Sequence, residues 1–466
     1  MLFSSIPFLY YFLPAVIILY FAVPKCLKNS VLLLSSLFFY GWGEPKYLIF
    51  MIISITQGYV FGLLIEKYHG RKRSKIFLTA SVLFSLGMLG YCKYADFFIG
   101  NFNAVTGLSL PLLRIALPIG ISFYTFQILS YAVDVYRGEV PAQRNFINLA
   151  AYISMFPQLI AGPIVRYSDI AKQLEHRTHT VAGAAIGVRR FIIGLSKKIL
   201  VANILGELVA TFKASDEKSV LFFWIYAVAY TLHIYFDFSG YSDMAIGLGH
   251  VFGFRFLENF DYPYISGSIT EFWRRWHMSL GSWFRDYLYI PLGGNRVSRP
   301  RWFLNIFIVW MATGLWHGAA WNFVLWGVLF AVLLMIEKLW LLGPLKKLRV
   351  LNHVYVMLLV ILSFVIFDAV DLPGAFSYIA AMFGGGGLPA VTAETFYYLK
   401  SYAVILLVGA LCATPLPKTL AAILEKHKFG SRILGTAEPL ALTALLAVCT
   451  AFLIDGSFNP FLYFRF

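Results

Sequence analysis

An apolar stretch at residues 302–336 constrains this chain more than any other segment. It is bounded by Arg301 and Glu337, and no residue inside it carries a full charge. A straight helix of this length would reach about 50 Å, whereas the hydrocarbon core of a bilayer is about 30 Å thick. The stretch must therefore tilt, bend or reverse, and we expect it to do so near His317 and Gly318.

His317 is an ionisable residue in the middle of this stretch. Ionisable groups inside a membrane are costly and usually mark function, so we predict that His317 is catalytic. The alternative is a structural histidine that hydrogen-bonds to a backbone carbonyl. The flanking glycines and three tryptophans favour catalysis. If the helix continues, Trp310, Thr313 and Trp321 share a face with His317 and, with Trp316 beside them, could form the wall of a narrow tunnel.

The composition indicates a polytopic helical membrane protein. Of the 466 residues, 59% are hydrophobic and 13% are charged, about half the charge of a soluble domain. The apolar runs are continuous, whereas a β-barrel would show alternating strands. The net charge of +15 sits in short loops between these runs, which favours contact with anionic lipid over nucleic acid. The four cysteines show neither metal-binding nor disulfide spacing.

The apolar runs divide the chain into spans and one polar segment. Further spans are predicted near 6–23, 31–42, 47–65, 76–98, 115–133, 191–212, 219–247, 352–370, 398–413 and 436–455. The run at 147–165 contains Pro157 and Pro163, and we interpret it as re-entrant. The segment 254–301 is rich in arginine and is expected at the cytoplasmic surface. If both of its flanks are cytoplasmic, 302–336 is a pair of short helices that meet near His317; one long crossing is the alternative.

A motif at 271–277 begins a segment with helical periodicity. Trp273 and Trp276 belong to its aromatic face, and His277 shares the face of Trp273. This pattern predicts a helix that lies in the membrane interface. Arg274 and Arg275 then either anchor lipid headgroups or bind the phosphates of an anionic donor. A single histidine in such a place is more often structural than catalytic.

A second polar motif ends the apolar span at 219–247. Asp237 and Asp243 follow His233, which lies on the same helical face as Asp237. No further ligands are spaced to complete a metal site, so none is predicted. We expect the two aspartates to bind polar groups or to orient another residue.

Several motifs together resemble the membrane-bound O-acyltransferase family, in particular its bacterial branch of alginate and related polysaccharide or peptidoglycan acetylation proteins. They are the segments 122–127, 156–163, 236–243, 272–277, 291–296, 316–318 and 459–466. The resemblance covers nearly the whole chain. It implies one integral-membrane domain over 1–466, with about eleven transmembrane helices plus re-entrant and interfacial helices around a central pore.

The resemblance also implies a function. The family's invariant histidine corresponds to His317, and its second polar position corresponds to His277. An acetyl group from cytoplasmic acetyl-CoA would reach the outer face of a bacterial inner membrane, where a partner acetyltransferase completes transfer to a polysaccharide such as alginate. A thioester on an acyl carrier protein is the alternative donor, and no cofactor is expected. The alternative functions are a proton-coupled transporter or flippase, and a non-catalytic scaffold for that partner.

Overall fold

The structure, a computed structural model, describes residues 1–43 and 45–456, and it contains helices and no strands within those ranges. The all-helical class is therefore confirmed. The chain forms two compact units, one made of Met1–Phe191 with Met244–Leu257 and the other of Ile192–Asp243 with Glu258–Phe466. The motif at 459–466, which contributed to the resemblance, lies outside the described residues. A single domain over 1–466 stays a prediction.

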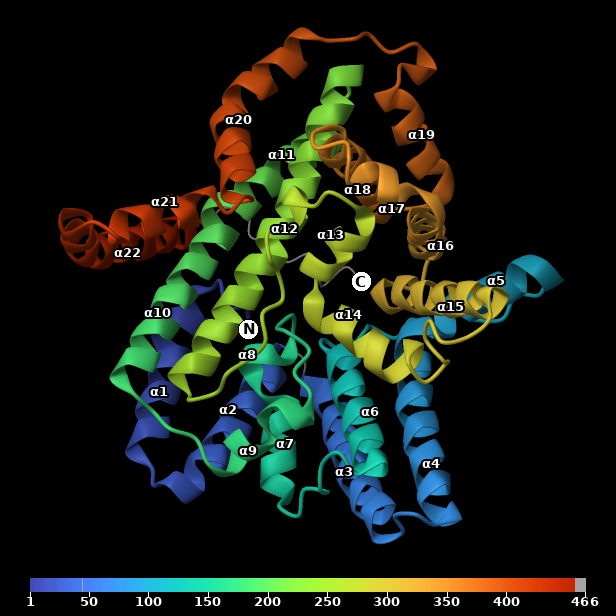
Figure 1. The fold of residues 1–466 in the computed structure, drawn as a ribbon, viewed down its shortest axis with the longest axis vertical. Helices are drawn as coiled ribbons and strands as arrows, with labels where there is room; N and C mark the ends of the chain where they lie inside the picture. The colour runs from blue at the N-terminus through green and yellow to red at the C-terminus, as the bar shows by residue number, and fades with distance from the viewer. Residues whose placement is uncertain (44, 457–466) are drawn as a thin grey trace. The chain divides into compact units, whose positions relative to one another are not determined.

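The first unit is a bundle of helices (Figure 1). Its helices are α1 (Leu13–Ala22), α2 (Lys28–Gly43), α3 (Leu48–Lys67), α4 (Lys72–Leu89), α5 (Ala95–Thr106), α6 (Ile121–Arg137), α7 (Phe146–Ser154), α8 (Phe156–Leu159), α9 (Tyr167–Glu175) and most of α10 (Val181–Ser196). Helices α3, α4 and α6 pack on one another, and α2 packs on α7. Small residues permit this approach: a Cβ at Gly62 of α3 would lie 2.7 Å from the ring of Tyr131 on α6.

The run at 147–165 is broken, as its prolines predict. Helix α7 begins at a side-chain cap, in which Asn145 accepts hydrogen bonds from the backbone of Ile147 and Asn148. It ends at Ser154, and Pro157 lies in the first turn of the short helix α8, where proline is tolerated. Entry and exit on one side of the membrane stay a prediction.

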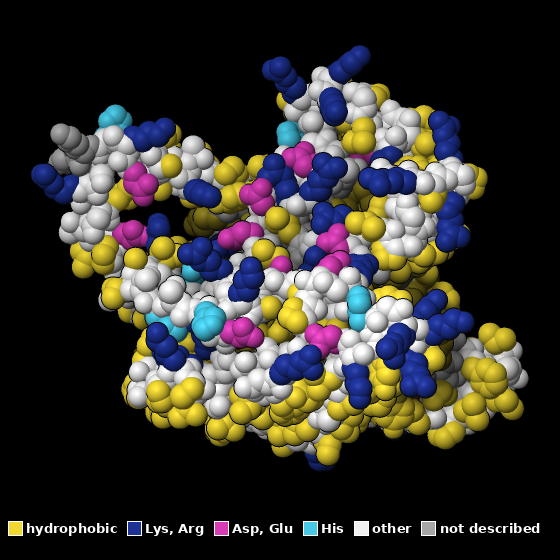
Figure 2. Space-filling model, turned by 60° about the horizontal axis from the view of Figure 1, so that its bottom comes forward, with side chains coloured by type: hydrophobic (Ala, Val, Ile, Leu, Met, Phe, Trp, Pro, Cys, Tyr) yellow, Lys and Arg dark blue, Asp and Glu magenta, His cyan; other side chains and the backbone are white. Residues whose placement is uncertain are grey.

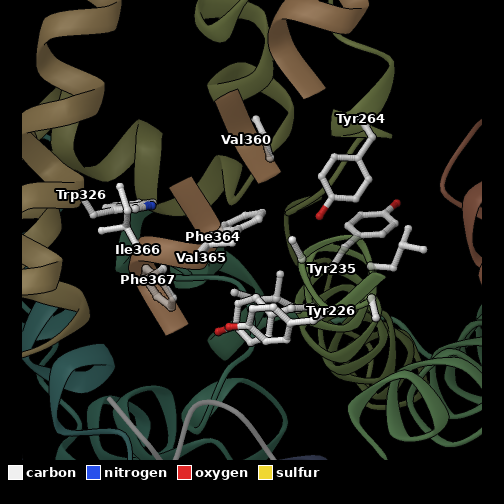
Figure 3. Close-up of a cluster of buried hydrophobic side chains, with 14 of the residues drawn as sticks. Tyr226, Tyr235, Tyr264, Trp326, Val360, Phe364, Val365, Ile366 and Phe367 are labelled. Carbon is white, nitrogen blue, oxygen red and sulfur yellow. The ribbon is translucent and has the colours of Figure 1, made fainter. Parts of the chain in front are cut away.

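The second unit carries the residues predicted to act in catalysis. Its helices are α11 (Asn203–Ala214), most of α12 (Val220–Val251), α13 (Ile269–Arg275), α14 (Met278–Phe284), α15 (Arg299–His317), α16 (Trp321–Ile336), α17 (Leu342–Leu345), α18 (Leu351–Asp368), α19 (Leu372–Met382), α20 (Ala393–Cys412), α21 (Leu416–Glu425) and α22 (Lys428–Ile454). Its core is aromatic, and Figure 3 shows Trp326 of α16 beside Phe367 of α18.

The long apolar stretch forms two helices, which settles the choice that the sequence left open. Helix α15 ends at His317, and α16 begins at Trp321 and packs back against α15. Two glycines let the backbones approach: a Cβ on Gly314 would lie 2.4 Å from the carbonyl oxygen of Phe323, and one on Gly327 would lie 2.5 Å from that of Trp310. The chain therefore reverses after His317.

Seven helical segments of the described chain are long and apolar enough to cross a membrane. They are Pro45–Lys67, Lys72–Thr106, Val220–Val251, Trp321–Leu345, Leu351–Asp368, Ala393–Cys412 and Gly430–Ile454. Two shorter apolar helices, Pro7–Ala22 and Leu372–Met382, accompany them. The polytopic class is thus confirmed, while a total of about eleven spans and a central pore stay predictions.

Hydrophobic side chains cover broad areas of the surface (Figure 2). Large apolar residues are exposed along the candidate spans, for example Val404 on α20 and Leu440 on α22. Exposing such surfaces to water would cost free energy, whereas lipid tails solvate them well.

Candidate active site

His317 is buried at the last position of α15, with 8% of its surface exposed. Three aromatic rings surround its imidazole nearly edge to face. The ring centroids of Trp316, Trp326 and Phe367 lie 5.0, 5.1 and 5.3 Å away. These rings come from α15, α16 and α18, so the hairpin turn after His317 is what brings Trp326 against it. Neither Trp326 nor Phe367 was predicted from the sequence to be a site residue.

His277 lies close to this group and is 1% exposed. Its ring is 5.8 Å from that of Trp316 and 4.7 Å from that of Phe238 on α12. Burial, followed by the electrostatic effect of the nearby His317, lowers the pKa of His277 well below its ordinary value. The structure thus brings both predicted catalytic histidines together.

The helix predicted to begin at the 271–277 motif does not continue through His277. Helix α13 ends at Arg275, and His277 adopts a left-handed conformation with φ of 44°. A hydrogen bond from the backbone N–H of Met278 to the carbonyl of Asn259 (2.9 Å) holds this break. A non-glycine residue with positive φ is uncommon and is often found at functional sites. His277 therefore does not share a helical face with Trp273.

The aromatic side of the 271–277 motif packs inside the protein, which corrects the predicted interfacial orientation. Trp276 is buried and lies 5.3 Å from Phe364 of α18. Trp273 lies 4.7 Å from Trp310 and 5.4 Å from Trp326. An extended aromatic cluster thus links α13 to the hairpin.

The two arginines of the motif differ in their surroundings. Arg275 is held within the protein: its Nε donates to Glu271 (2.9 Å) and its Nη1 to the carboxylate of Asp261 (2.8 Å). Arg274 is exposed. Of these two arginines, Arg274 is therefore the one whose guanidinium group forms no ion pair with a described residue.

Asp237 and Asp243 each pair with a lysine. Lys198 Nζ lies 2.6 Å from Asp237 Oδ1, with both side chains almost completely buried, and Lys197 Nζ lies 2.6 Å from Asp243 Oδ2. His233 instead contacts the carbonyl of Ala202 at 2.6 Å. The two lysines begin a π-helical turn at Lys197–Ala202. Neither lysine was predicted from the sequence to be a site residue, although two adjacent lysines inside an apolar run are a signal.

The predicted tunnel face is only partly present. Trp310 and Thr313 are buried on α15, as is His317. Trp321 begins α16 after the turn and is 53% exposed, so it does not lie on the same helical face. The expectation fails because it assumed a continuous helix. Within the described residues, no group of three or more His, Cys, Asp or Glu side chains is placed to hold a metal ion.

Comparison with known proteins identifies the family. A model of the membrane-bound O-acyltransferase family matches residues 113–365, which contain both histidines, the hairpin and the 271–277 motif. The chain belongs to this family. It is an O-acyltransferase and, as predicted, a multi-pass protein of the bacterial inner membrane.

Similar bacterial proteins cover most or all of the chain. A probable alginate O-acetylase of Azotobacter vinelandii is 40% identical and is aligned over the full length of both chains. A probable alginate O-acetylase of Pseudomonas aeruginosa is 45% identical over 83% of this chain and 75% of its own. A peptidoglycan O-acetyltransferase of Helicobacter pylori is 30% identical over 100% of this chain and 98% of its own.

Proposed function

We propose that this O-acyltransferase transfers an acetyl group from cytoplasmic acetyl-CoA for O-acetylation of an extracytoplasmic polysaccharide, with His317 as the catalytic base. The observation that carries the proposal is the burial of His317 beside a second histidine and three aromatic rings. The names of the relatives, two alginate O-acetylases and a peptidoglycan O-acetyltransferase, support a polysaccharide acceptor.

The chemistry follows from an imidazole in a dry environment. A neutral imidazole of His317 takes the proton of the acceptor hydroxyl as its oxygen attacks the thioester carbonyl carbon. The C–S bond then breaks, and the leaving thiolate takes the proton back from the imidazolium. Trp326, whose buried Nε1 has no hydrogen-bond partner among the described residues, offers a donor for the negative charge that develops on the carbonyl oxygen.

The donor and the partner belong to the same proposal. The exposed guanidinium of Arg274 suits the phosphates of acetyl-CoA or the phosphopantetheine of an acyl carrier protein. A partner acetyltransferase outside the membrane would complete the transfer to the glycan. Purified protein supplied with acetyl-CoA or an acetylated carrier protein would show which donor it accepts.

The test is a His317→Ala variant assayed for acetyl transfer in purified form with no ion gradient. We expect the turnover number to fall by roughly 100-fold to 10,000-fold, as for the loss of a general base. The matched control is His69→Ala, at an exposed histidine of the first unit. Wild-type transfer by a folded His317→Ala protein would refute the catalytic role.

The same assay distinguishes the two alternative functions. A proton-coupled transporter would show no acyl transfer without a gradient. A scaffold would tolerate His317→Ala but fail when its partner is removed. A proton-coupled transporter would use His317 and Asp237 to relay protons. The ion pair of Asp237 with Lys198 disfavours that role for Asp237.

A further inference from the structure

The side chain of Asn259 contacts Nδ1 of His277, and this contact bears on which ring nitrogen carries the proton. Its side-chain Oδ1 lies 3.1 Å from Nδ1 of His277, 3.3 Å from the backbone nitrogen of Ser279 and 2.9 Å from Oγ of Ser279. Its Nδ2 donates to Oγ of Ser242 on α12 at 3.0 Å. Asn259 is itself 1% exposed, so these groups have no access to bulk water.

The orientation of the amide follows from the backbone of Ser279. A backbone N–H can only donate, so the Asn259 atom that faces it must be the oxygen. The same oxygen faces Nδ1 of His277. Since an amide oxygen only accepts, Nδ1 must carry the hydrogen, and in a neutral imidazole Nε2 then has a lone pair.

Nε2 of His277 is buried and has no hydrogen-bond partner among the described residues. Buried polar atoms are normally paired, and an exception calls for an explanation such as a bound ligand. The neighbouring rings are Phe238 of α12 and Trp316 of α15. The left-handed backbone at His277 is a second exception at the same residue.

We propose that Asn259 is a positioning residue that, with Ser279, holds His277 as the Nδ1–H tautomer, so that Nε2 is a buried acceptor for an O–H group of the substrate. This inference rests on the proposed acyl transfer. His277 then orients the hydroxyl-bearing group of the substrate against His317. Protonation of Nε2 of His277 removes this hydrogen-bond acceptor.

The pKa of His277 should respond to a charge placed at position 259. The titratable group that acts on it is His317 on α15, and burial together with His317 disfavours the imidazolium. On α12, Asp237 and Asp243 are paired with Lys198 and Lys197. Glu271 and Asp261, which both precede the break in the chain, are paired with Arg275.

The first test reads the tautomer directly, without using activity. Nitrogen-15 spectra of histidine-labelled protein in lipid, with the His277 signal assigned by its loss in His277→Gln, should show an unprotonated Nε2 and a protonated Nδ1. A protonated Nε2 in the wild-type protein would overturn the proposal. This outcome is independent of whether His317→Ala abolishes acetyl transfer, so failure here differs from failure of the proposed function.

The second test uses two substitutions of similar size. Asn259→Leu removes the acceptor and should lower kcat/KM by roughly tenfold to a hundredfold, while Asn259→Asp keeps the acceptor and should restore the tautomer. Neither affects the backbone carbonyl that binds Met278. The carboxylate of Asn259→Asp favours imidazolium, so it should shift the acid limb of the pH–activity profile to higher pH.

The control is Asn101→Leu, the same exchange at an asparagine of α5 in the first unit that bonds to the carbonyl of Phe97. It should leave activity and the pH profile unchanged. An acid limb in Asn259→Asp identical to that of the wild type would contradict the proposal. If Asn259→Leu does not fold, the spectra of the wild type and of Asn259→Asp still decide.

Discussion

Oε2 of Glu337 accepts hydrogen bonds from both the backbone N–H and the hydroxyl of Thr270, each at 2.7 Å. Its Oε1 accepts from the backbone N–H of Ile269 at 2.6 Å, and the whole residue is buried. A carboxylate at the start of a helix satisfies amides that have no partner within the helix and complements its dipole. Glu337 thus ties the start of α13 to the end of α16, and with it the chain that leads to His277.

Glu337→Ala is expected to destabilise the protein and reduce activity together. Each buried N–H left without a partner costs about 1–3 kcal/mol. Thermal unfolding in detergent should show a lower midpoint, and acetyl transfer should fall because α13 loses its anchor. Glu425→Ala, at an exposed position on α21, is the control and should leave both unchanged. An unaltered midpoint for Glu337→Ala would show that the contact contributes little.

Gly314→Ala tests the close approach of α15 and α16. The added Cβ would lie 2.4 Å from the backbone carbonyl of Phe323, so the helices must separate. Overpacking of this kind typically costs about 1–3 kcal/mol, and here it also moves Trp326 relative to His317. We expect a lower unfolding midpoint and reduced turnover. Gly343→Ala, where a Cβ meets nothing within 4 Å, should behave like the wild type.

The buried pair of Lys198 and Asp237 should respond to single and double substitution differently. Asp237→Ala leaves a buried ammonium without its counter-ion, which typically costs about 3–5 kcal/mol. Replacing both residues with apolar ones, as in Lys198→Met with Asp237→Leu, should cost less than Asp237→Ala alone. A comparison of unfolding midpoints in a double-mutant cycle measures the coupling.

A control for that pair is Arg285→Gln, which removes an exposed contact with Asp286 at 2.6 Å. Exposed ion pairs contribute about 0–1 kcal/mol, so the midpoint should hardly change. Equal changes of the unfolding midpoint in Asp237→Ala and Arg285→Gln would contradict the prediction that a buried ion pair contributes more to stability than an exposed one.

Substitutions of Arg274 and Arg275 should have different effects in kinetic assays, although the two residues are adjacent in the sequence. Arg274→Gln should raise the KM for the donor more than it lowers kcat, as expected for lost ground-state binding. Arg275→Gln breaks contacts with Glu271 and Asp261 and should lower thermal stability instead. A larger KM effect from Arg275→Gln would reverse the two assignments.

The fold class and His317 could be inferred from the sequence because their signals are strong, whereas His277 was singled out through the family resemblance. Uncharged runs long enough to cross a bilayer define spans, and an ionisable residue within one stands out. The partners of these residues could not be inferred in the same way. Trp326 and Phe367 reach His317 from α16 and α18, and no spacing along the chain predicts such contacts.

Two of the errors had one common cause, which was the assumption that helical periodicity continues. It placed Trp321 on the face of His317 and His277 on the face of Trp273. Both helices in fact end at or just before the histidine, at His317 in α15 and at Arg275 in α13. Those endings involve contacts outside the helix itself, with Asn259 after α13 and with Phe323 of α16 in the case of α15.

The sequence by itself determined that this is a helical membrane protein and made His317 and His277 candidate site residues. The class and His317 could be inferred because bilayer thickness and the cost of buried charge act on local composition. Only the tertiary structure decided that the chain reverses after His317, that Asp237 pairs with Lys198, and that Asn259 meets Nδ1 of His277. These features depend on close approach between distant segments, and close approach is a property of packing in three dimensions.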